Sequence, residues 1–193
     1  DGQDIAQVSI ASLRRTIGGV QQDSFLFTAS VDHNVAYGDP STDMDQIVQA
    51  STDAQIHSFI EELPRNYQTL VGEDGVSLSG GQRQRVSIAR GTLTDAPIFI
   101  FDDATAAIDA GTELRIRRAL KARAGTHTTI IISHRLVSIM HADEILFLDE
   151  GCIVERGTHE QLLALKGRYF ELHSLQLRDE HRSPHLTERV KPA

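Results

Sequence analysis

The chain has 193 residues, with 19 Lys and Arg against 27 Asp and Glu and a formal net charge of −8, which argues against a general nucleic-acid-binding surface. Hydrophobic residues make up 40% of the sequence, enough for a packed core, and one cysteine excludes a framework of internal disulfides. The apolar runs, such as residues 98–101, are far shorter than the roughly 20 residues that cross a bilayer.

The first half of the sequence alternates short helical patterns with loops. Residues 17–20 (IGGV) predict a strand, and residues 43–63 predict one or two helices that end before Pro64. Residues 82–93 predict a helix with an apolar side. The opposite side carries three arginines, a pattern typical of a solvated face: Arg83, Arg85 and Arg90.

The second half alternates strands with helices. Three apolar runs predict buried strands: residues 98–101, 128–133 and 145–148. Residues 111–122 lie between the first two and predict a helix. This order indicates βαβ units and a parallel sheet flanked by helices. Three further segments predict a hairpin strand and two terminal helices: residues 152–156, 158–165 and 169–177.

Polar side chains follow the predicted strands. Asp102 and Asp103 come after residues 98–101, His134 comes after the second buried strand, and Gln22 follows residues 17–20. Ligands of parallel α/β sheets bind beyond the carboxyl ends of the strands. Carboxylates there would suit Mg²⁺ and phosphate, and an imidazole or amide beside them would suit phosphoryl transfer.

A glycine pair opens the helix predicted after residue 81. Ser79 is a natural N-cap, and Gly80 and Gly81 leave the first turn without side-chain cover, which favours phosphate binding. Each of these features also has a purely structural interpretation when taken alone. Ser-Gly-Gly can be a loop entering a helix, Asp-Asp an ordinary turn, and His134 an exposed histidine.

The order of these pieces resembles the nucleotide-binding domain of ATP-binding-cassette (ABC) transporters. Residues 78–82 read LSGGQ, the family's signature sequence. Residues 98–102 (IFIFD) are similar to the Walker B strand, and residues 106–109 (AAID) to the D-loop. Residues 132–136 (ISHRL) resemble the switch-histidine segment, and residues 20–27 (VQQDSFLF) the Q-loop.

The resemblance implies a P-loop NTPase-like α/β fold with a parallel sheet core and a helical signature subdomain. It implies ATP and Mg²⁺ as cofactors, with Gln22 and Asp102 helping to hold the metal. Asp103 and His134 would be catalytic, and Asp109 would couple two subunits. The residues implied to contact an ATP held by a second cassette are Ser79, Gly80, Gly81 and Gln82.

Three further segments resemble exporter-type cassettes: residues 30–38, 71–75 and 157–162. In such proteins a membrane-spanning domain is usually fused ahead of the cassette, which then lies on the cytoplasmic face of a membrane. Residues 25–37 and Glu73 would lie near the coupling helices of that domain, and Glu73 would also take part in coupling between subunits. The expected partners are this domain and a second cassette, with no nucleic acid.

The first departure from the family concerns the phosphate loop. The family places G-x-x-x-x-G-K-[ST] ahead of the Q-loop, and none of the 14 glycines here is followed by lysine. The Walker A motif is therefore absent, and we expect the preceding strands and helix to be missing with it. The chain is then expected to be the rear part of a cassette, inactive alone and poorly soluble.

These expectations divide the chain in two. Residues 1–177 are expected to form a partial nucleotide-binding domain, with a helical subdomain at about residues 28–95 inserted in the α/β core. Residues 178–193 are expected to form a polar, flexible tail.

The second departure is Asp103, because the family usually has glutamate at this position to orient the attacking water. Aspartate is one methylene shorter, a retreat of about 1.5 Å. Heterodimeric exporters commonly carry such a substitution in one subunit, whose intact signature completes the active site of its partner. The sequence therefore predicts a subunit with a degenerate catalytic site, paired with a different subunit.

Two other interpretations remain open. The chain could be a truncated, non-catalytic fragment that serves as an interaction module, which the missing Walker A motif favours. It could also belong to the ABC-type DNA-repair ATPases, which share the signature and Walker B motifs. Many of those proteins contain a long coiled coil between the ATPase lobes, and this sequence has no heptad array.

Overall fold

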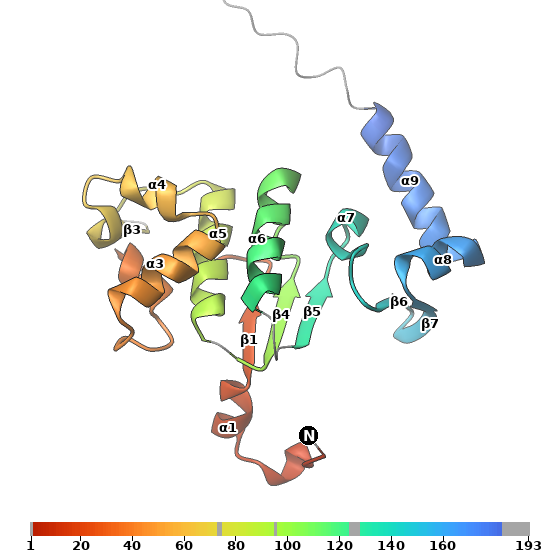
Figure 1. Ribbon diagram of the computed structural model, residues 1–193, viewed down its shortest axis with the longest axis horizontal. Helices are drawn as coiled ribbons and strands as arrows, with labels where there is room; N and C mark the ends of the chain where they lie inside the picture. The colour runs from red at the N-terminus through yellow and green to blue at the C-terminus, as the bar shows by residue number, and fades with distance from the viewer. Residues whose placement is uncertain (1, 73–74, 95, 124–127, 183–193) are drawn as a thin grey trace, which may run out of the picture. The chain divides into compact units, whose positions relative to one another are not determined.

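The computed structural model describes residues 2–72, 75–94, 96–123 and 128–182 (Figure 1). The chain divides into two compact units, residues 1–132 and residues 133–193, and each has its own hydrophobic core. No helix in the described part of the chain is long and apolar enough to cross a membrane.

The first unit contains a parallel three-stranded sheet in the order β1-β4-β5. Its strands are β1 (Ile17–Val20), β4 (Ile98–Asp102) and β5 (Thr128–Ile132). The sequence predicted all three strands, and the structure confirms that they run parallel in an α/β fold. Their carboxyl ends therefore lie at one edge of the sheet.

Helix α5 (Gly80–Leu93) packs closely on one face of this sheet, with α6 (Ala110–Arg123) beside it (Figure 1). Gly91 makes this approach possible. A Cβ atom there would come within 2.7 Å of the Phe99 ring and 2.9 Å of Val20 Cγ2. Any larger residue at position 91 would push the helix away from the strands.

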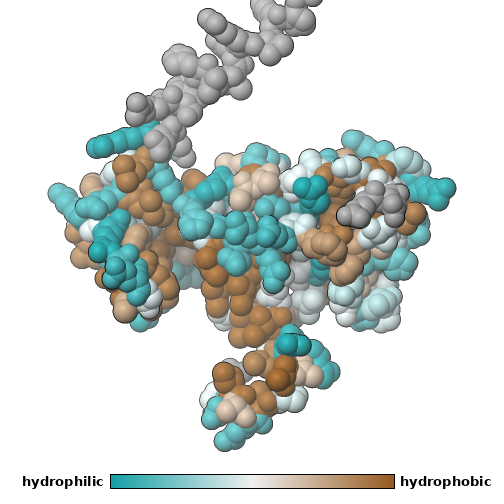
Figure 2. Space-filling view, turned by 180° about the vertical axis from the view of Figure 1, so that it is seen from behind, coloured by the Kyte–Doolittle hydropathy of each residue, from teal (hydrophilic) through white to brown (hydrophobic). Residues whose placement is uncertain are grey.

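The opposite face of the sheet is apolar and partly exposed. It carries the exposed Ile17, Ile130 and Ile132. Ile17 alternates with buried positions in β1, and Ile130 and Ile132 flank the partly buried Ile131 in β5. Figure 2 shows a patch of hydrophobic surface over this part of the first unit. An apolar face on both sides fits strands of the buried, parallel type.

A helical layer packs against the other side of α5 and shares its core. It consists of α2 (Val31–Val35), α3 (Met44–Asp53) and α4 (His57–Glu61). The helical stretch predicted at residues 43–63 therefore forms two helices, α3 and α4. A short antiparallel pair, β2 (Ala29–Ser30) and β3 (Leu70–Val71), was not predicted, because two residues are too short to show a periodicity. The remaining elements are η1 (Ile5–Gln7), α1 (Ile10–Arg15) and η2 (Asn66–Gln68).

The second unit is a hairpin packed against helices. The hairpin joins β6 (Ile145–Asp149) to β7 (Cys152–Gly157), and the helices are α7 (Leu136–Ile139), α8 (His159–Leu165) and α9 (Arg168–Arg182). Helix α9 is longer than the sequence predicted, and residues 183–193 of the expected tail lie outside the described residues.

The pairing of β6 corrects one expectation. The sequence predicted it as a further strand of the parallel sheet, whereas β6 and β7 form a separate two-stranded sheet. The predicted hairpin strand is confirmed, because β7 returns antiparallel to β6. A two-residue turn joins the two strands. Glu150 and Gly151 both have positive φ, 46° and 77°, as a tight hairpin turn requires.

The core of the second unit includes a hydrogen bond between α8 and α9. His159 Nδ1 lies 2.7 Å from the hydroxyl oxygen of the buried Tyr169, and the His173 ring packs against His159. Burial lowers the pKa of His159, and His173 and His141 lower it further, against Glu160, which raises it. The folded unit therefore favours the neutral imidazole.

We expect this histidine to make the second unit less stable at mildly acidic pH. The unfolded chain binds a proton at His159 below about pH 6.5, whereas the folded unit binds it only at lower pH, so stability falls as the pH drops through 6.5. Amide-exchange protection factors across α8 should be lower at about pH 5.5 than at about pH 7.5. In His159→Asn, which has no such titration, this difference should shrink. An unchanged difference would assign the pH dependence to another group.

Candidate functional site

Three of the predicted site residues lie just beyond the carboxyl ends of β1 and β4. Val20 pairs with Phe101 in the parallel register, so Gln22 and Asp103 each follow the same edge by two residues. Asp102 is the last residue of β4, and both it and Gln22 are exposed. The structure therefore brings these polar groups to one edge of the sheet.

The donors at this edge suit Mg²⁺ only in part. A carboxylate and an amide supply the oxygen ligands that Mg²⁺ prefers. No group of three or more His, Cys, Asp or Glu in the described residues could hold a metal ion. Asp102 and Gln22 therefore fit a metal whose other ligands are phosphate oxygens and water, as is usual for Mg²⁺ beside a nucleotide.

Asp103 occupies a strained turn after β4. Its φ is +43°, in the left-handed region that Asp adopts more readily than most non-glycine residues. Its amide donates a hydrogen bond to the Ile132 carbonyl (2.8 Å), and its own carbonyl accepts one from the Ala106 amide (3.2 Å). The residue is only 9% exposed. Because the backbone is held on both sides, side-chain length decides how far the carboxylate reaches.

The signature segment, residues 78–82, forms the start of helix α5. Ser79 is the N-cap, and its hydroxyl accepts a hydrogen bond from the Gln82 amide (3.3 Å). In return, the Gln82 side chain accepts one from the Ser79 amide (2.7 Å), which completes a capping box. The helix therefore begins at Gly80, two residues earlier than predicted, and its positive dipole end carries both glycines.

The start of α5 also rests on the loop before α6. A Cβ atom on Gly81 would lie 2.7 Å from the Ala107 carbonyl oxygen, so only glycine fits at this contact. One turn further along, the buried Gln84 accepts a hydrogen bond from the Ala107 amide (2.9 Å). The two contacts hold the D-loop-like segment, residues 106–109, against the signature helix.

Asp109 ends this loop by capping α6. It is exposed, and its carboxylate accepts a hydrogen bond from the Thr112 amide (2.9 Å). Thr112 lowers the pKa of Asp109, first through this backbone bond and then through its side chain, so the carboxylate is charged at neutral pH. A fixed negative charge is thus displayed beside the signature helix.

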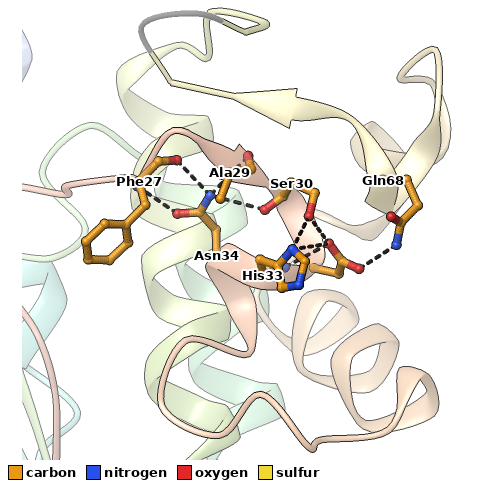
Figure 3. Close-up of polar contacts among 7 residues, drawn as sticks. Phe27, Ala29, Ser30, His33, Asn34 and Gln68 are labelled. Atoms are coloured by element: carbon orange, nitrogen blue, oxygen red, sulfur yellow. Dashed lines mark hydrogen bonds and ion pairs between the residues drawn. The ribbon is translucent and has the colours of Figure 1, made fainter.

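The segment of residues 25–37, which we call the aromatic segment, is organised around Asn34 (Figure 3). The Asn34 side chain accepts a hydrogen bond from the Phe27 amide (2.9 Å) and donates to the carbonyls of Phe27 (3.0 Å), Ala29 (3.4 Å) and Ser30 (3.2 Å). It is fully buried. Since one amide side chain satisfies four backbone groups, it fixes the shape of the loop.

Arg90 of α5 joins this segment to the helix. Its guanidinium donates to the Asn34 carbonyl (2.7 Å), to Asn34 Oδ1 (3.0 Å) and to the Phe25 carbonyl (3.1 Å). The Phe27 and Tyr37 rings stack on each other with centroids 4.2 Å apart, and the guanidinium lies 5.5 Å and 5.7 Å from their centres. The expected solvated arginine face is therefore wrong for Arg90.

His134 belongs to the second unit. Its side chain is exposed, and its backbone carbonyl accepts a hydrogen bond from the Gln176 side chain of α9 (2.6 Å). The side-chain oxygen of Gln176 accepts a hydrogen bond from the backbone amide of Leu136 (3.0 Å), so α9 holds the backbone on both sides of Arg135. Glu73, the remaining predicted site residue, lies outside the described residues.

Sequence reasoning missed three residues that organise this site: Asn34, Gln84 and Arg90. Each one contacts a segment far away in the chain, which periodicity does not reveal. Asn34 lies within residues 30–38 in no pattern of its own, and Arg90 shares a helix side with Arg83. The available signal was helical spacing, which places the polar side chains of Gln84 and Arg90 next to apolar residues of the same helix.

Comparisons with known proteins agree on one family. The sequence profile described as "ABC transporter" matches residues 1–106. An ATP-dependent lipid A-core flippase of Syntrophus aciditrophicus is 47% identical over 180 residues, which are 93% of this chain and 30% of that protein. P-glycoprotein 14 of Caenorhabditis elegans is 44% identical over 89% of this chain and 13% of its own length.

The solved structures include a close match to this chain. The structure of a bacterial Atm1-family ABC exporter with ATP bound superimposes with a TM-score of 0.87 at 45% sequence identity. The match covers 91% of this chain and 31% of that one. The chain thus spans less than a third of the length of these relatives.

The contact at Gly81 leads to a test of the site's packing. We expect Gly81→Ala to destabilise the chain by about 1–3 kcal/mol, because the added methyl group would overlap the Ala107 carbonyl. The matched control is Gly80→Ala, whose methyl group would lie 3.6 Å from Ala107 Cβ and should change stability by less than about 0.5 kcal/mol. Urea unfolding midpoints measure both. Equal midpoints would mean that the loop shifts without cost.

Proposed function

The chain belongs to the ABC transporter family, and we propose that it is the ATP-binding and ATP-hydrolysing domain of an exporter that powers transport across a membrane. The observation that carries the proposal is the LSGGQ segment, capped at the start of α5 and packed on the loop that leads to Asp109. Relatives that are named as a flippase and an exporter support outward transport.

We propose that two cassettes work as a pair. The first turn of α5, with Ser79 as its cap, would present its amides and positive dipole end to the phosphates of an ATP held mainly by the partner. Asp109 and Glu73 would link the two sites across the interface. The close contact of Gly81 with Ala107 supports this, because it would make the signature and the Asp109 loop respond together.

The residues at the sheet edge would serve the phosphate end of the nucleotide. Gln22 and Asp102 would help to hold Mg²⁺, which supplies charge neutralisation at the phosphates when bound. His134 would donate a hydrogen bond to the terminal phosphate and stabilise negative charge there. Asp103 would orient a water molecule, at reduced efficiency because of its short side chain.

The aromatic segment would contact a membrane-spanning domain. Phe25 and Tyr37 are 65% and 58% exposed, unusual for large aromatic side chains, and they lie together over Phe27. Such a patch is suited to the apolar end of a partner helix. The cassette would then lie on the cytoplasmic face of a membrane, with the membrane-spanning domain in the same polypeptide.

A second, different subunit would supply the stronger catalytic site. Asp103 stands in a turn whose backbone is fixed, so a shorter side chain is not compensated by movement of the main chain. The signature of this chain is intact and would complete the partner's site. This division of labour favours a heterodimer over a homodimer.

The alternative is a non-catalytic interaction module. This alternative concerns the 193 residues alone, in which no glycine is directly followed by lysine. We expect the 193-residue chain by itself to bind ATP no tighter than millimolar and to hydrolyse none, because the phosphate cradle and its lysine are absent. Isothermal titration with Mg-ATP measures this. Micromolar affinity would contradict it and would imply another phosphate-binding loop.

The role of Asp103 is tested in the intact transporter with its partner subunit. We expect Asp103→Glu to raise the ATP hydrolysis rate about tenfold or more, because it restores a reach of roughly 1.5 Å to a group whose misplacement by ~1 Å costs on the order of a hundredfold. Asp103→Asn, which keeps the length and removes the charge, should give no gain. A steady-state phosphate-release assay separates the two. An unchanged rate in Asp103→Glu would show that this side chain does not limit the site.

A further inference from the structure

We propose that Arg90 and Asn34 are positioning residues that bind the aromatic segment to helix α5, so that the segment and the signature at the helix start move as one body. The inference deepens the proposed function and rests on it. These two side chains would transmit movement from the aromatic segment, which would face the membrane domain, to the signature residues, which would face ATP.

The link between Arg90 and the aromatic segment has a fixed geometry. The Arg90 guanidinium is planar, and it meets three oxygen acceptors at 2.7–3.1 Å on two residues of the segment. Three bonds from one rigid group fix both distance and orientation. A single bond would leave the segment free to rotate about it.

The aromatic segment itself is stiff. Asn34 is both the main acceptor for Arg90 and the side chain that ties down the backbone of Phe27, Ala29 and Ser30 (Figure 3). Asp32, two residues before Asn34, accepts hydrogen bonds from the Gln68 side chain (2.5 Å) and the Ser30 hydroxyl. These bonds hold the start of α2 in place. A displacement of the segment would therefore reach α5 without being absorbed by bending of the loop.

A membrane-spanning partner would act on the exposed aromatic rings of the segment. The exposed Phe25 and Tyr37 rings pack on Phe27, and the Arg90 guanidinium lies against Phe27 and Tyr37. A partner that binds these rings would therefore displace Arg90, the side chain that holds them to α5. Gln21, Gln22 and Asp23, which connect the segment to β1, are exposed in an irregular stretch. The chain that joins the segment to β1 therefore has no regular structure, whereas the segment is held to α5 by the Arg90 and Asn34 bonds.

Hydrogen exchange tests the link directly in the purified intact protein. In Arg90→Met and in Asn34→Asp, the peptide that contains the Phe27 amide should lose protection by about tenfold or more, because the loop is no longer held. Asn34→Asp keeps the acceptor for Arg90 but places an oxygen against three carbonyls. The control is Arg118→Met, which removes an exposed arginine of α6 in the same unit and should leave this peptide unchanged.

Steady-state kinetics of ATP hydrolysis by the same proteins test the transmission. In Arg90→Met, kcat should fall about tenfold while the KM for ATP stays within about twofold, because the signature is mispositioned and the loops that first bind ATP are untouched. Arg90→Lys keeps the charge but cannot reach the three acceptors together, so it should behave like Arg90→Met. The double variant with Asn34→Asp should lose no more than either single one, since the two act as a unit.

Two results would overturn the inference. Unchanged protection of the Phe27 peptide in Arg90→Met would show that the segment is held by other contacts. Lost protection with unchanged kcat and KM would show that the link is purely structural. If the unsubstituted intact transporter, with its partner subunit, hydrolyses no ATP at all, the proposed function fails. The exchange experiment would then still decide whether Arg90 and Asn34 hold the segment to α5.

Discussion

The close packing of α5 on the parallel sheet is the constraint on which the first unit depends. Gly91 allows the helix to touch Phe99 and Val20 directly, at distances that no other residue would permit. A helix held this tightly cannot tilt without opening the core. The helix supports one loop near each of its ends: the loop at Ala107 near its start and the aromatic segment at Arg90.

The sequence predicted the sheet well because its strands carry strong, unambiguous patterns. Residues 17–20, 98–102 and 128–132 are short apolar runs, and their parallel order follows from the helix between the last two. The positions of Gln22, Asp102 and Asp103 at one edge follow from the same pattern. The roles of these residues, and those of Ser79–Gln82, His134, Asp109 and Glu73, stay predictions that the family resemblance motivates.

The contacts that stiffen the site could not be predicted, for physical reasons that differ from residue to residue. Arg90 bonds to Asn34 across 56 positions of sequence, and Gln84 reaches Ala107 across 23. A long polar side chain on a helix looks solvated unless the neighbouring element is known, because its charge dominates the local pattern. The hairpin of β6 and β7 was predicted from its turn, but the separation of β6 from the parallel sheet was not, because a buried apolar run does not show which strands it pairs with.

The hydrogen bond between Gln176 and the His134 carbonyl has a consequence for how the protein is made. The two residues are 42 positions apart, and the contact comes from the last helix of the described chain. A ribosome adds about 5–20 residues per second, so the backbone at His134 is synthesised seconds before the residue that holds it in place. During that interval the loop has no anchor on α9. Its final geometry is therefore a late event in biosynthesis, reached only after α9 has emerged and docked.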